Sequence, residues 1–451
     1  MPDTIAALST GAQVSAIGIV RLSGDRAVEL ADALFTPASG IRMTDSAPRS
    51  LVYGRLHRRD GELLDVCMCT VSRAPNSYTG EDTAEFQCHG SPVVLRELLG
   101  ELFALGARQA LPGEFTKRAF LNGRMELSSA EAVADLIDAE SAESARNAAG
   151  QLSGALAART ERIYSALADI SAHYHAVLDY PDEDIEDFRL ERYEAVLHGI
   201  CAELEALLAT HERGRLMSSG LRAAIIGRPN AGKSSLLNAL LGYERAIVTA
   251  VPGTTRDTIE ERLRLGGLTL RLTDTAGIRE TDDELERLGV ERSLSAIENS
   301  ELVIAVVDGS VEFSAEDADI IAAAERAPHA LVVISKRDLR APFQVATSLP
   351  VVSLSSVTGE GIEELERVIG EMFPMPSVPA GEILTNVRHA DAIRRALEYV
   401  RSSLGAMERA RTPDIVLTET EGAMAAIGEL SGRTVREDVT ERIFSRFCVG
   451  K

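Results

Sequence analysis

The segment at residues 227–234 constrains this chain more than any other, because it reads Gly-Arg-Pro-Asn-Ala-Gly-Lys-Ser. A short apolar stretch at 223–226 comes before it, and a stretch of helical composition at 234–241 comes after it. A glycine-rich loop between a buried strand and a helix can turn its backbone N–H groups around a phosphate, and the helix N-terminus adds positive potential. The pattern therefore predicts a phosphate-binding loop, although a glycine-rich turn with an exposed lysine would satisfy the same letters.

Side chains that meet the charges of a nucleotide are expected in and after this loop. Lys233 is placed to reach the terminal phosphates, and the hydroxyl of Ser234 is placed to face Mg²⁺. Downstream, leucines alternate with polar residues at 268–272 as in a strand, which leads to Asp-Thr-Ala-Gly at 274–277. An acidic residue there holds Mg²⁺ through water, and the glycine N–H can meet a γ-phosphate. Between these elements lies a Gly/Thr segment, in which Thr255 would complete the Mg²⁺ shell.

A later segment would select the base. Residues 335–338 read Ser-Lys-Arg-Asp after an apolar run, and the carboxylate of Asp338 can accept two hydrogen bonds from the guanine edge. Adenine cannot supply these donors. Small GTPases usually carry asparagine where this chain has Ser335, and the asparagine amide ties the base-reading loop to the phosphate loop. A serine hydroxyl is shorter, so we predict that guanine selection is kept, that the hydroxyl does not span this gap and that nucleotide affinity is weaker.

Together these signatures predict a Ras-like α/β P-loop GTPase domain over residues 218–376. A further strand at 351–354 ends in two serines, which resemble the loop that touches the guanine carbonyl. Mg²⁺ is expected on Ser234 and Thr255. The residues expected to bind GTP are Asn230, Ala231, Gly232, Lys233, Ser234, Ser235, Thr249, Ala250, Val251, Pro252, Gly253, Thr254, Thr255, Asp274, Thr275, Ala276, Gly277, Ser335, Lys336, Asp338, Ser355 and Ser356.

The whole chain has room for about three domains, with 451 residues of which 45% are hydrophobic and 26% charged. It has no apolar run of about 20 residues, and its N-terminus lacks a basic segment followed by an apolar one. We therefore expect a cytoplasmic protein without a membrane span. The net charge of −22 argues against general nucleic-acid binding, because phosphate contacts need lysine and arginine. Any RNA contact is expected to be local and to fall on the N- or C-terminal segment.

The cysteines are odd in number and scattered, at Cys67, Cys69, Cys88, Cys201 and Cys448. Cys67 and Cys69 would share one face of a strand. A zinc site would need a second such pair, which the sequence lacks. Reduced thiols are therefore favoured over a metal site.

Helical segments flank the predicted GTPase domain. Residues 119–217 are rich in Ala, Leu and Glu and are predicted to be helical, with one strong break at the acidic turn 180–184. Residues 389–410 and 415–447 are predicted to be helical as well. An apolar stripe near the end is formed by Val439, Ile443 and Phe447. One all-α domain in two halves, 119–217 and 377–451, with the GTPase domain inserted between them is favoured over two unrelated bundles.

The first 118 residues differ from this helical composition. Strands are predicted around 17–22 and 66–71, separated by turns rich in Gly and Pro, and a helix is predicted near 92–105. This pattern indicates an α+β module.

The chain ends in Phe447-Cys448-Val449-Gly450-Lys451, and four further landmarks stand at 78–82, 89–90, 112–115 and 118–122. The landmarks read Tyr-Thr-Gly-Glu-Asp, His-Gly, Pro-Gly-Glu-Phe and Arg-Ala-Phe-Leu-Asn. With the GTPase signatures, they make essentially the whole chain resemble the MnmE (TrmE) family of tRNA-modification GTPases. The family usually ends in Cys-Ile-Gly-Lys, so Val449 is a mild change.

The resemblance implies a domain order and a reaction. It implies an N-terminal folate-binding and dimerisation domain at 1–118, and a helical domain that carries the Cys-x-Gly-Lys tail. It also implies a homodimer that forms a heterotetramer with the flavoprotein MnmG (GidA) and binds tRNA. The complex would add a carboxymethylaminomethyl or aminomethyl group at carbon 5 of the wobble uridine.

The one-carbon donor implied by the resemblance is 5-formyltetrahydrofolate or a related tetrahydrofolate. Its contacts fall on Arg21, Glu85, Arg124 and Lys451. Arg124 stands where relatives often have lysine, which keeps the charge but changes the geometry. The loop at 10–15 also departs from the more Gly/Arg-rich turn of relatives.

Hydrolysis needs a group that orients water, and the residue after Gly277 is the aliphatic Ile278 rather than the glutamine of Ras-like proteins. By resemblance, K⁺ takes the place of an arginine finger when two GTPase domains pair, and Glu286 positions the water. The expected K⁺ ligands are Asn230, Thr249, Val251 and Thr254. Read alone, Glu286 belongs to a solvated acidic helix start. Cys448 is either a buried core thiol or, as the family tail implies, a polarised thiol near the folate.

Two other functions compete with this interpretation. An Era-like ribosome-assembly GTPase would act as a switch without covalent chemistry, and it predicts a basic C-terminal RNA-binding domain. Residues 381–451 instead balance basic and acidic side chains. A structural or signalling GTPase would leave the N-terminal landmarks unexplained.

Overall fold

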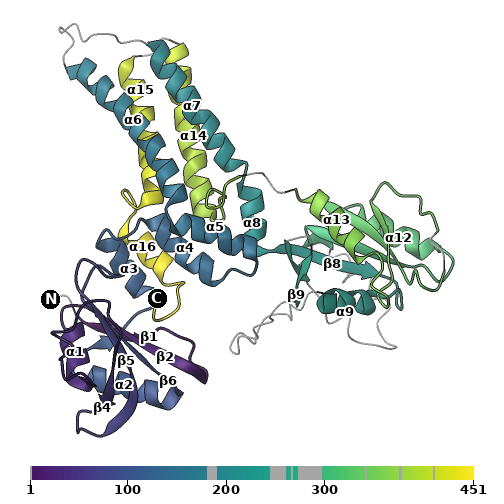
Figure 1. The fold of residues 1–451 in the computed structure, drawn as a ribbon. Coiled ribbons are helices and arrows are strands. Elements are labelled where there is room, and N and C mark those ends of the chain that lie inside the picture. The colour runs from purple at the N-terminus through teal and green to yellow at the C-terminus, as the bar shows by residue number, and fades with distance from the viewer. Residues whose placement is uncertain are drawn as a thin grey trace. The chain divides into compact units, whose positions relative to one another are not determined.

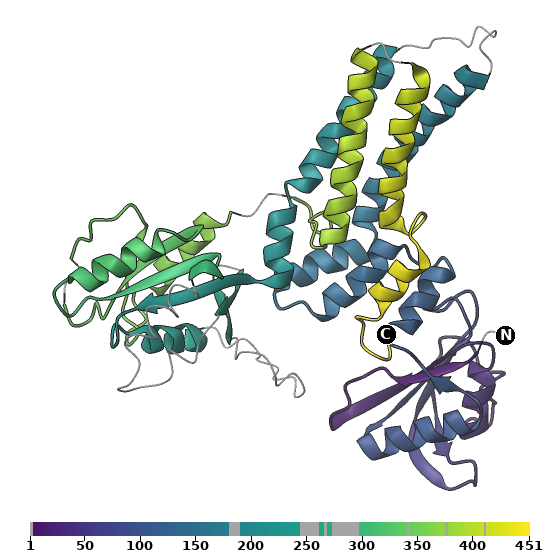
Figure 2. The same ribbon diagram turned by 180° about the vertical axis from the view of Figure 1, so that it is seen from behind.

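The computed structural model describes residues 3–179, 190–243, 261–265, 268–272, 297–340, 343–374, 378–409 and 412–451. The chain divides into two compact units, one of residues 1–137, 148–204 and 392–451 and the other of 138–147 and 205–391. Figures 1 and 2 show the elements of both units from opposite sides. The structure is a multidomain assembly of an α+β module, a set of helices and a Ras-like α/β domain.

The first unit begins with a seven-stranded sheet in the order β3-β4-β5-β6-β2-β1-β7. Its pairs are antiparallel except that β1 and β7 are parallel. The strands are β1 (Ile5–Leu8), β2 (Ser15–Ser23), β3 (Phe35–Pro37), β4 (Val52–His57), β5 (Leu63–Ser72), β6 (Thr83–Gly90) and β7 (Arg108–Gln109). The strands predicted around 17–22 and 66–71 are confirmed as parts of β2 and β5.

One face of this sheet forms the main core of the module. Alternate residues of β5 and β6, such as Cys69 and Phe86, are buried there, as the two-residue period of a strand requires. Helices α1 (Ala27–Leu34) and α2 (Pro92–Ala104) pack their apolar side chains against this face. The helix predicted near 92–105 is therefore confirmed as α2.

Helices make up the rest of the first unit and the segments around it. They are α3 (Glu114–Leu121), α4 (Leu127–Ile137), α5 (Ala142–Leu152), α6 (Ala155–Asp179), α7 (Leu190–Leu208), α14 (Val387–Glu408), α15 (Pro413–Ser431) and α16 (Glu437–Phe444). The prediction of a single strong break before residue 217 is wrong, because non-helical residues separate α3 from α4, α4 from α5 and α5 from α6. The predicted break at 180–184 lies outside the described residues.

The segment 415–447, predicted to be helical, is confirmed as α15 and α16, but the residues between these two helices are not helical. Gly432 ends α15 with a left-handed φ of 91°, and a Cβ there would lie 2.6 Å from the ring of Phe120. The apolar stripe is shifted as well, because Val439 is 38% exposed whereas Phe444 and Phe447 are buried. Glycine stops the helix where the local composition predicted continuation.

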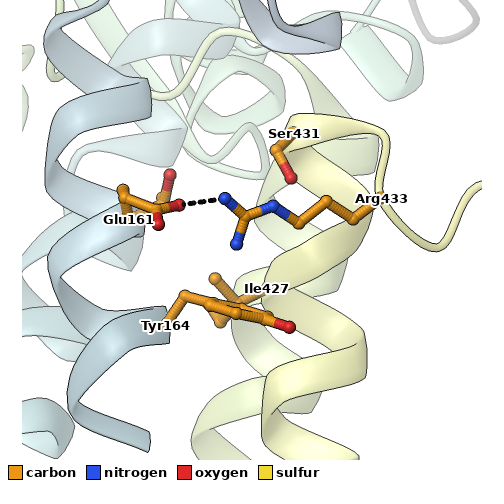
Figure 3. A pocket seen from close by; sticks show the side chains of 6 residues that line it. Glu161, Tyr164, Ile427, Ser431 and Arg433 are labelled. Carbon is orange, nitrogen blue, oxygen red and sulfur yellow. Dashed lines mark ion pairs between the residues drawn. The ribbon is translucent and has the colours of Figure 1, made fainter. Parts of the chain in front are cut away.

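Arg433 fastens the turn after α15 to α6, as Figure 3 shows. Its guanidinium lies 4.5 Å from the ring centroid of Tyr164 and forms an ion pair with Glu161 at 2.8 Å. Ile427 and Ser431 line the same hollow. The hollow is filled by the arginine, so it is a packing contact between α6 and α15.

The second unit contains a six-stranded sheet in the order β13-β12-β11-β8-β10-β9, in which only β9 and β10 are antiparallel. Its strands are β8 (Leu221–Gly227), β9 (Glu261–Leu265), β10 (Leu268–Leu272), β11 (Leu302–Asp308), β12 (His329–Ser335) and β13 (Val351–Ser353). The described helices of this unit, besides the parts of the helices named above that extend into it, are α8 (His211–Ser219), α9 (Lys233–Tyr243), α12 (Ala315–Ala324) and α13 (Ile362–Met372). The near-continuous apolar strands are typical of a parallel sheet covered on both faces.

Within the described ranges, no helix combines the length and the apolar character that crossing a bilayer requires.

Candidate functional site

The carboxyl ends of three parallel strands meet at one edge of the second sheet. Val306 of β11 pairs with Gly227 at the end of β8, and Asp308 at the end of β11 pairs with Ser335 at the end of β12. Loops that follow such strand ends are where open α/β sheets bind ligands. The loop predicted to hold phosphates and the loop predicted to read the base therefore emerge side by side.

The phosphate-loop backbone adopts left-handed conformations at two positions. Asn230 has φ 60° and Gly232 has φ 97°, and α9 then begins at Lys233. A Cβ at Gly232 would lie 3.3 Å from the Ser335 hydroxyl, so the absence of a side chain lets the two loops approach. The helix N-terminus lies directly after this curve, which is the geometry that favours an anion.

Lys233 folds back over the loop that precedes it. Its ammonium donates to the backbone oxygens of Gly227 at 2.7 Å and Arg228 at 2.8 Å. Burial lowers the pKa of Lys233, because the charged form has lost hydration. A phosphate at this point would stabilise the charged form of Lys233.

The base-reading loop is tied to the phosphate loop by Lys336. Its ammonium contacts the Asn230 backbone oxygen at 2.9 Å and the Asp308 carboxylate at 2.5 Å. Burial opposes ionisation of Asp308, but the hydrogen bonds from Lys336 and Ser310 outweigh it and lower the pKa of this carboxyl. The charged pair therefore holds both loops at the sheet edge.

Ser335 makes a second tie, contrary to the prediction from the sequence. Its hydroxyl donates to the backbone oxygen of Ala231 at 2.6 Å, with the Val307 oxygen at 3.1 Å. The expectation that a hydroxyl cannot span this gap is wrong. The reason is that Gly232 brings the phosphate loop close enough for the shorter side chain.

The remaining described base-site residues differ in accessibility. Asp338 lies exposed in the turn after β12, where its carboxylate faces no partner that would compete with a base among the described residues. Ser355 is buried, and its hydroxyl accepts from the backbone N–H groups of Val357 at 3.3 Å and Thr358 at 3.2 Å. Ser355 thus shapes its loop, and half-buried Ser356 follows it.

A second set of predicted residues lies on the first unit. Arg21 on β2 and Glu85 on β6 are paired neighbours in the sheet, and their side chains form an ion pair at 2.7 Å. The Arg21 guanidinium also lies 5.6 Å from the ring centroid of Tyr78 and 5.7 Å from that of Phe115. The structure thus combines a cation, a carboxylate and two aromatic rings on the sheet face opposite the main core.

The C-terminal tail docks beside this cluster. The N–H of Gly113 donates to the Cys448 oxygen at 3.3 Å, and the N–H of Phe115 donates to the Lys451 oxygen at 3.2 Å. Gly450 has φ 98°, and a Cβ on it would lie 2.1 Å from the Leu8 oxygen. Only glycine fits there, because any side chain would displace the tail from the loop after β1.

The docked tail presents Cys448 to solvent. The alternative of a buried core thiol at this position is therefore wrong, since Phe444 and Phe447 occupy the core instead. Arg124 is exposed, and its side chain lies beside Gly80 of the first unit. A Cβ on Gly80 would lie 3.2 Å from the Arg124 Cγ.

The aromatic members of this cluster were not predicted from the sequence. Tyr78 and Phe115 stand in the landmark segments 78–82 and 112–115, so the motifs themselves carried the signal. The hydroxyl groups of Tyr78 and Thr116 are 2.9 Å apart, which joins the first landmark to α3.

Known proteins match the chain along its length. The model of the GTP-binding protein TrmE N-terminus matches residues 4–124, and the model of the MnmE helical domain matches residues 127–448. A tRNA modification GTPase MnmE from Heliobacterium modesticaldum is 40% identical, covering 100% of this chain and 99% of its own. The chain belongs to the MnmE family of tRNA modification GTPases. MnmE of Bacillus velezensis is also 40% identical, with 100% of both chains covered.

Among solved structures, the G domain of the T. maritima FeoB iron transporter is 27% identical over 34% of this chain and 97% of its own, with a TM-score of 0.25.

Membership of the MnmE family makes this chain a GTP hydrolase involved in tRNA modification, with GTP and Mg²⁺ as expected ligands of the loops at the sheet edge. Ser234 is exposed at the start of α9, directly after the phosphate loop. Ser235, the next predicted GTP-binding residue, is also exposed on α9. The remaining predicted GTP, Mg²⁺, K⁺ and water-positioning residues lie outside the described residues: Thr249, Ala250, Val251, Pro252, Gly253, Thr254, Thr255, Asp274, Thr275, Ala276, Gly277 and Glu286.

Proposed function

We propose that this MnmE-family GTPase works with the flavoprotein MnmG (GidA) to add a carboxymethylaminomethyl or aminomethyl group at carbon 5 of the wobble uridine of certain tRNAs. A tetrahydrofolate, such as 5-formyltetrahydrofolate, supplies the one-carbon unit in the cytoplasm. The full-length match to the MnmE family carries this proposal.

The folate contacts proposed for the first unit are Arg21, Glu85, Arg124 and Lys451. Glu85 can accept hydrogen bonds from the donor edge of a pterin ring, and the cations can face the formyl oxygen or the glutamyl carboxylate. The exposed ring of Tyr78 beside Arg21 offers a flat apolar surface to the ring system, whereas the ring of Phe115 is buried and packs near the Arg21 guanidinium. The proposed chemistry therefore fits the side chains that surround the docked tail.

Cys448 is the proposed reactive group of this site. The thiol is exposed, while its backbone oxygen is held by the N–H of Gly113. A thiol that is fixed through its backbone and open to solvent can meet a one-carbon unit on the folate. Replacement of Cys448 by serine should abolish modification and leave GTP hydrolysis intact.

GTP hydrolysis is proposed to depend on K⁺, bound by Asn230, Thr249, Val251 and Thr254, when the GTPase domains of a homodimer pair. The exposed side chain of Asn230, on the left-handed turn of the phosphate loop, supports this assignment. K⁺ would supply positive charge to the phosphates, and Glu286 would position the attacking water. Equal turnover in KCl and NaCl at matched ionic strength would remove K⁺ from the mechanism, and normal hydrolysis by Glu286→Ala would remove Glu286.

The Era-like alternative is disfavoured by the C-terminal segment. Residues 381–451 balance basic and acidic side chains, and the last residues dock on the N-terminal module through Ser9, whose hydroxyl donates to the Gly450 oxygen at 3.0 Å. A ribosome-assembly switch without covalent chemistry would not require a cysteine in a tail that docks beside a cation and two aromatic rings.

The experiment is a nucleoside analysis of tRNA by mass spectrometry. Cells lacking this chain should carry wobble uridines without the carbon-5 group, and the wild-type chain should restore it. Cys448→Ser should fail to restore it, whereas Cys201→Ser, which changes a cysteine of α7, should succeed. Unchanged wobble uridines in the deletion strain would contradict the proposal.

A further inference from the structure

The sheet of the first unit brings together two thiols that are distant in the sequence. Cys67 on β5 and Cys88 on β6 are both buried, and the Cys88 thiol donates to the Cys67 sulfur at 3.9 Å. Cys69, the neighbour of Cys67 on the same strand face, does not belong to this pair. The adjacent strand therefore supplies a second thiol beside Cys67, although the sequence has no second closely spaced pair of cysteines.

A carboxylate completes the group. Asp65 lies on the same strand face as Cys67, and ligand atoms of Asp65, Cys67 and Cys88 all lie within 4.8 Å of one another. Its side chain is 10% exposed, so Asp65 is the outermost member and an ion would enter past it. The group thus offers two sulfurs and one oxygen at the end of a buried sheet face.

The carboxylate of Asp65 is itself held in place. It accepts from the backbone N–H of His89 at 2.9 Å, and its other oxygen lies 2.8 Å from the His89 ring Nδ1. Hydrogen bonds of this kind orient the ligands of metal sites and raise their affinity. The exposed ring of His89 therefore orients the carboxylate of Asp65.

We propose that Cys67, Cys88 and Asp65 bind a zinc-like soft divalent cation. Zinc prefers tetrahedral sets of sulfur, nitrogen and oxygen, and bonds of 2.3 Å to two sulfurs place those sulfurs about 3.8 Å apart. The observed sulfur separation of 3.9 Å matches that tetrahedral edge. Water takes the fourth position, each thiol releases its proton to solvent on binding, and no oxidation or reduction takes place.

This site is separate from the residues proposed for folate. Arg21 and Glu85 lie on the opposite face of β2 and β6, because neighbouring residues of a strand point to opposite faces. The cation would stabilise the pairing of β5 with β6 in the middle of the sheet. Its role is structural.

The test uses the full-length protein, freed of metal with a chelator and titrated with Co²⁺ in excess Mg²⁺. Mg²⁺ occupies oxygen sites but does not compete for thiolates. We expect about one tightly bound Co²⁺ per chain with the intense thiolate-to-cobalt charge-transfer band of a tetrahedral site. Cys67→Ser and Cys88→Ser should lose the band, Asp65→Asn should weaken binding about tenfold or more, and Zn²⁺ should displace Co²⁺.

Matched cysteine variants serve as controls for the loss of the cobalt band. Cys69→Ser and Cys448→Ser remove one thiol each outside the group and should keep the band. In the wild-type chain, which avoids any folding defect, Zn²⁺ should slow alkylation of Cys67 and Cys88 and leave Cys69 unchanged. Absence of the band in the wild type, its survival in Cys88→Ser, or recovery of Cys67 and Cys88 as a disulfide would overturn the proposal.

Discussion

The hydroxyl of Ser335 donates a hydrogen bond of 2.6 Å to the backbone oxygen of Ala231, which joins the end of β12 to the phosphate loop. Lys336 adds a second tie, to the backbone oxygen of Asn230. These contacts couple the loop that would read guanine to the loop that would hold its phosphates. A serine does here what asparagine does in small GTPases.

Ser335→Ala should weaken GTP binding. Loss of one buried hydrogen bond costs about 1 kcal/mol, or roughly a fivefold rise in Kd. The measurement is titration with a fluorescent GTP analogue in Mg²⁺. Ser348→Ala is the control, because this serine lies in a loop of the same domain and its hydroxyl donates to the exposed carboxylate of Glu325. Equal affinity of Ser335→Ala and wild type would show that the tie does not support binding.

Gly450→Ala should undock the C-terminal tail. A methyl group there would lie 2.1 Å from the Leu8 oxygen, and φ 98° is unfavourable for alanine. Amide hydrogen exchange should then speed up at Gly113 and Phe115, which lose the Cys448 and Lys451 oxygens as acceptors. Gly100→Ala is the matched control, since nothing lies within 4 Å of its added Cβ. Unchanged exchange in Gly450→Ala would contradict the docking.

Glu114 should stabilise the first unit in a pH-dependent way. Its carboxylate pairs with Arg108 at 2.5 Å and Arg118 at 3.0 Å. Burial raises its pKa, but these arginines and the Leu111 N–H outweigh burial, so the net pKa lies below the ordinary 4.5. Because the pKa of Glu114 is lowered in the folded state, the stabilisation is fully present above the ordinary pKa of 4.5. It is lost as the pH falls through the lower pKa of the folded state.

The corresponding measurement is thermal unfolding of Glu114→Gln and wild type across this pH range. At neutral pH the variant should lose roughly 1–3 kcal/mol, and the difference should shrink below about pH 4. Glu62→Gln removes a carboxylate that is 68% exposed and should have almost no effect. A difference for Glu114→Gln that stays constant with pH would assign the stabilisation to packing.

Local patterns in the sequence predicted the elements around both sites well. The phosphate loop at 227–234 stood between a strand and a helix, as β8 and α9 confirm. The α+β character of the first module followed from the short alternating strands. The type of each of these elements follows from the spacing of apolar residues over a few helical turns or a few strand residues. This spacing can be read directly from the sequence.

Long-range contacts could not be predicted in this way. The reach of Ser335 depends on how closely Gly232 lets another loop approach, and the partner of Cys67 sits on a neighbouring strand. The end of α15 depends on Gly432 meeting the ring of Phe120. Each of these is set by tertiary packing between segments that the sequence does not place relative to one another.

Binding of guanine nucleotides by the loops that follow β8 and β12 depends on Asp338, whose carboxylate would accept two hydrogen bonds from the base. Titrations of wild type and Asp338→Asn with GTP and with XTP, both in Mg²⁺, compare the two bases. Asparagine offers one donor and one acceptor in place of two acceptors, so it suits the xanthine edge and not the guanine edge. The variant should lose GTP affinity and gain XTP affinity. Unchanged GTP affinity in Asp338→Asn would contradict the assignment.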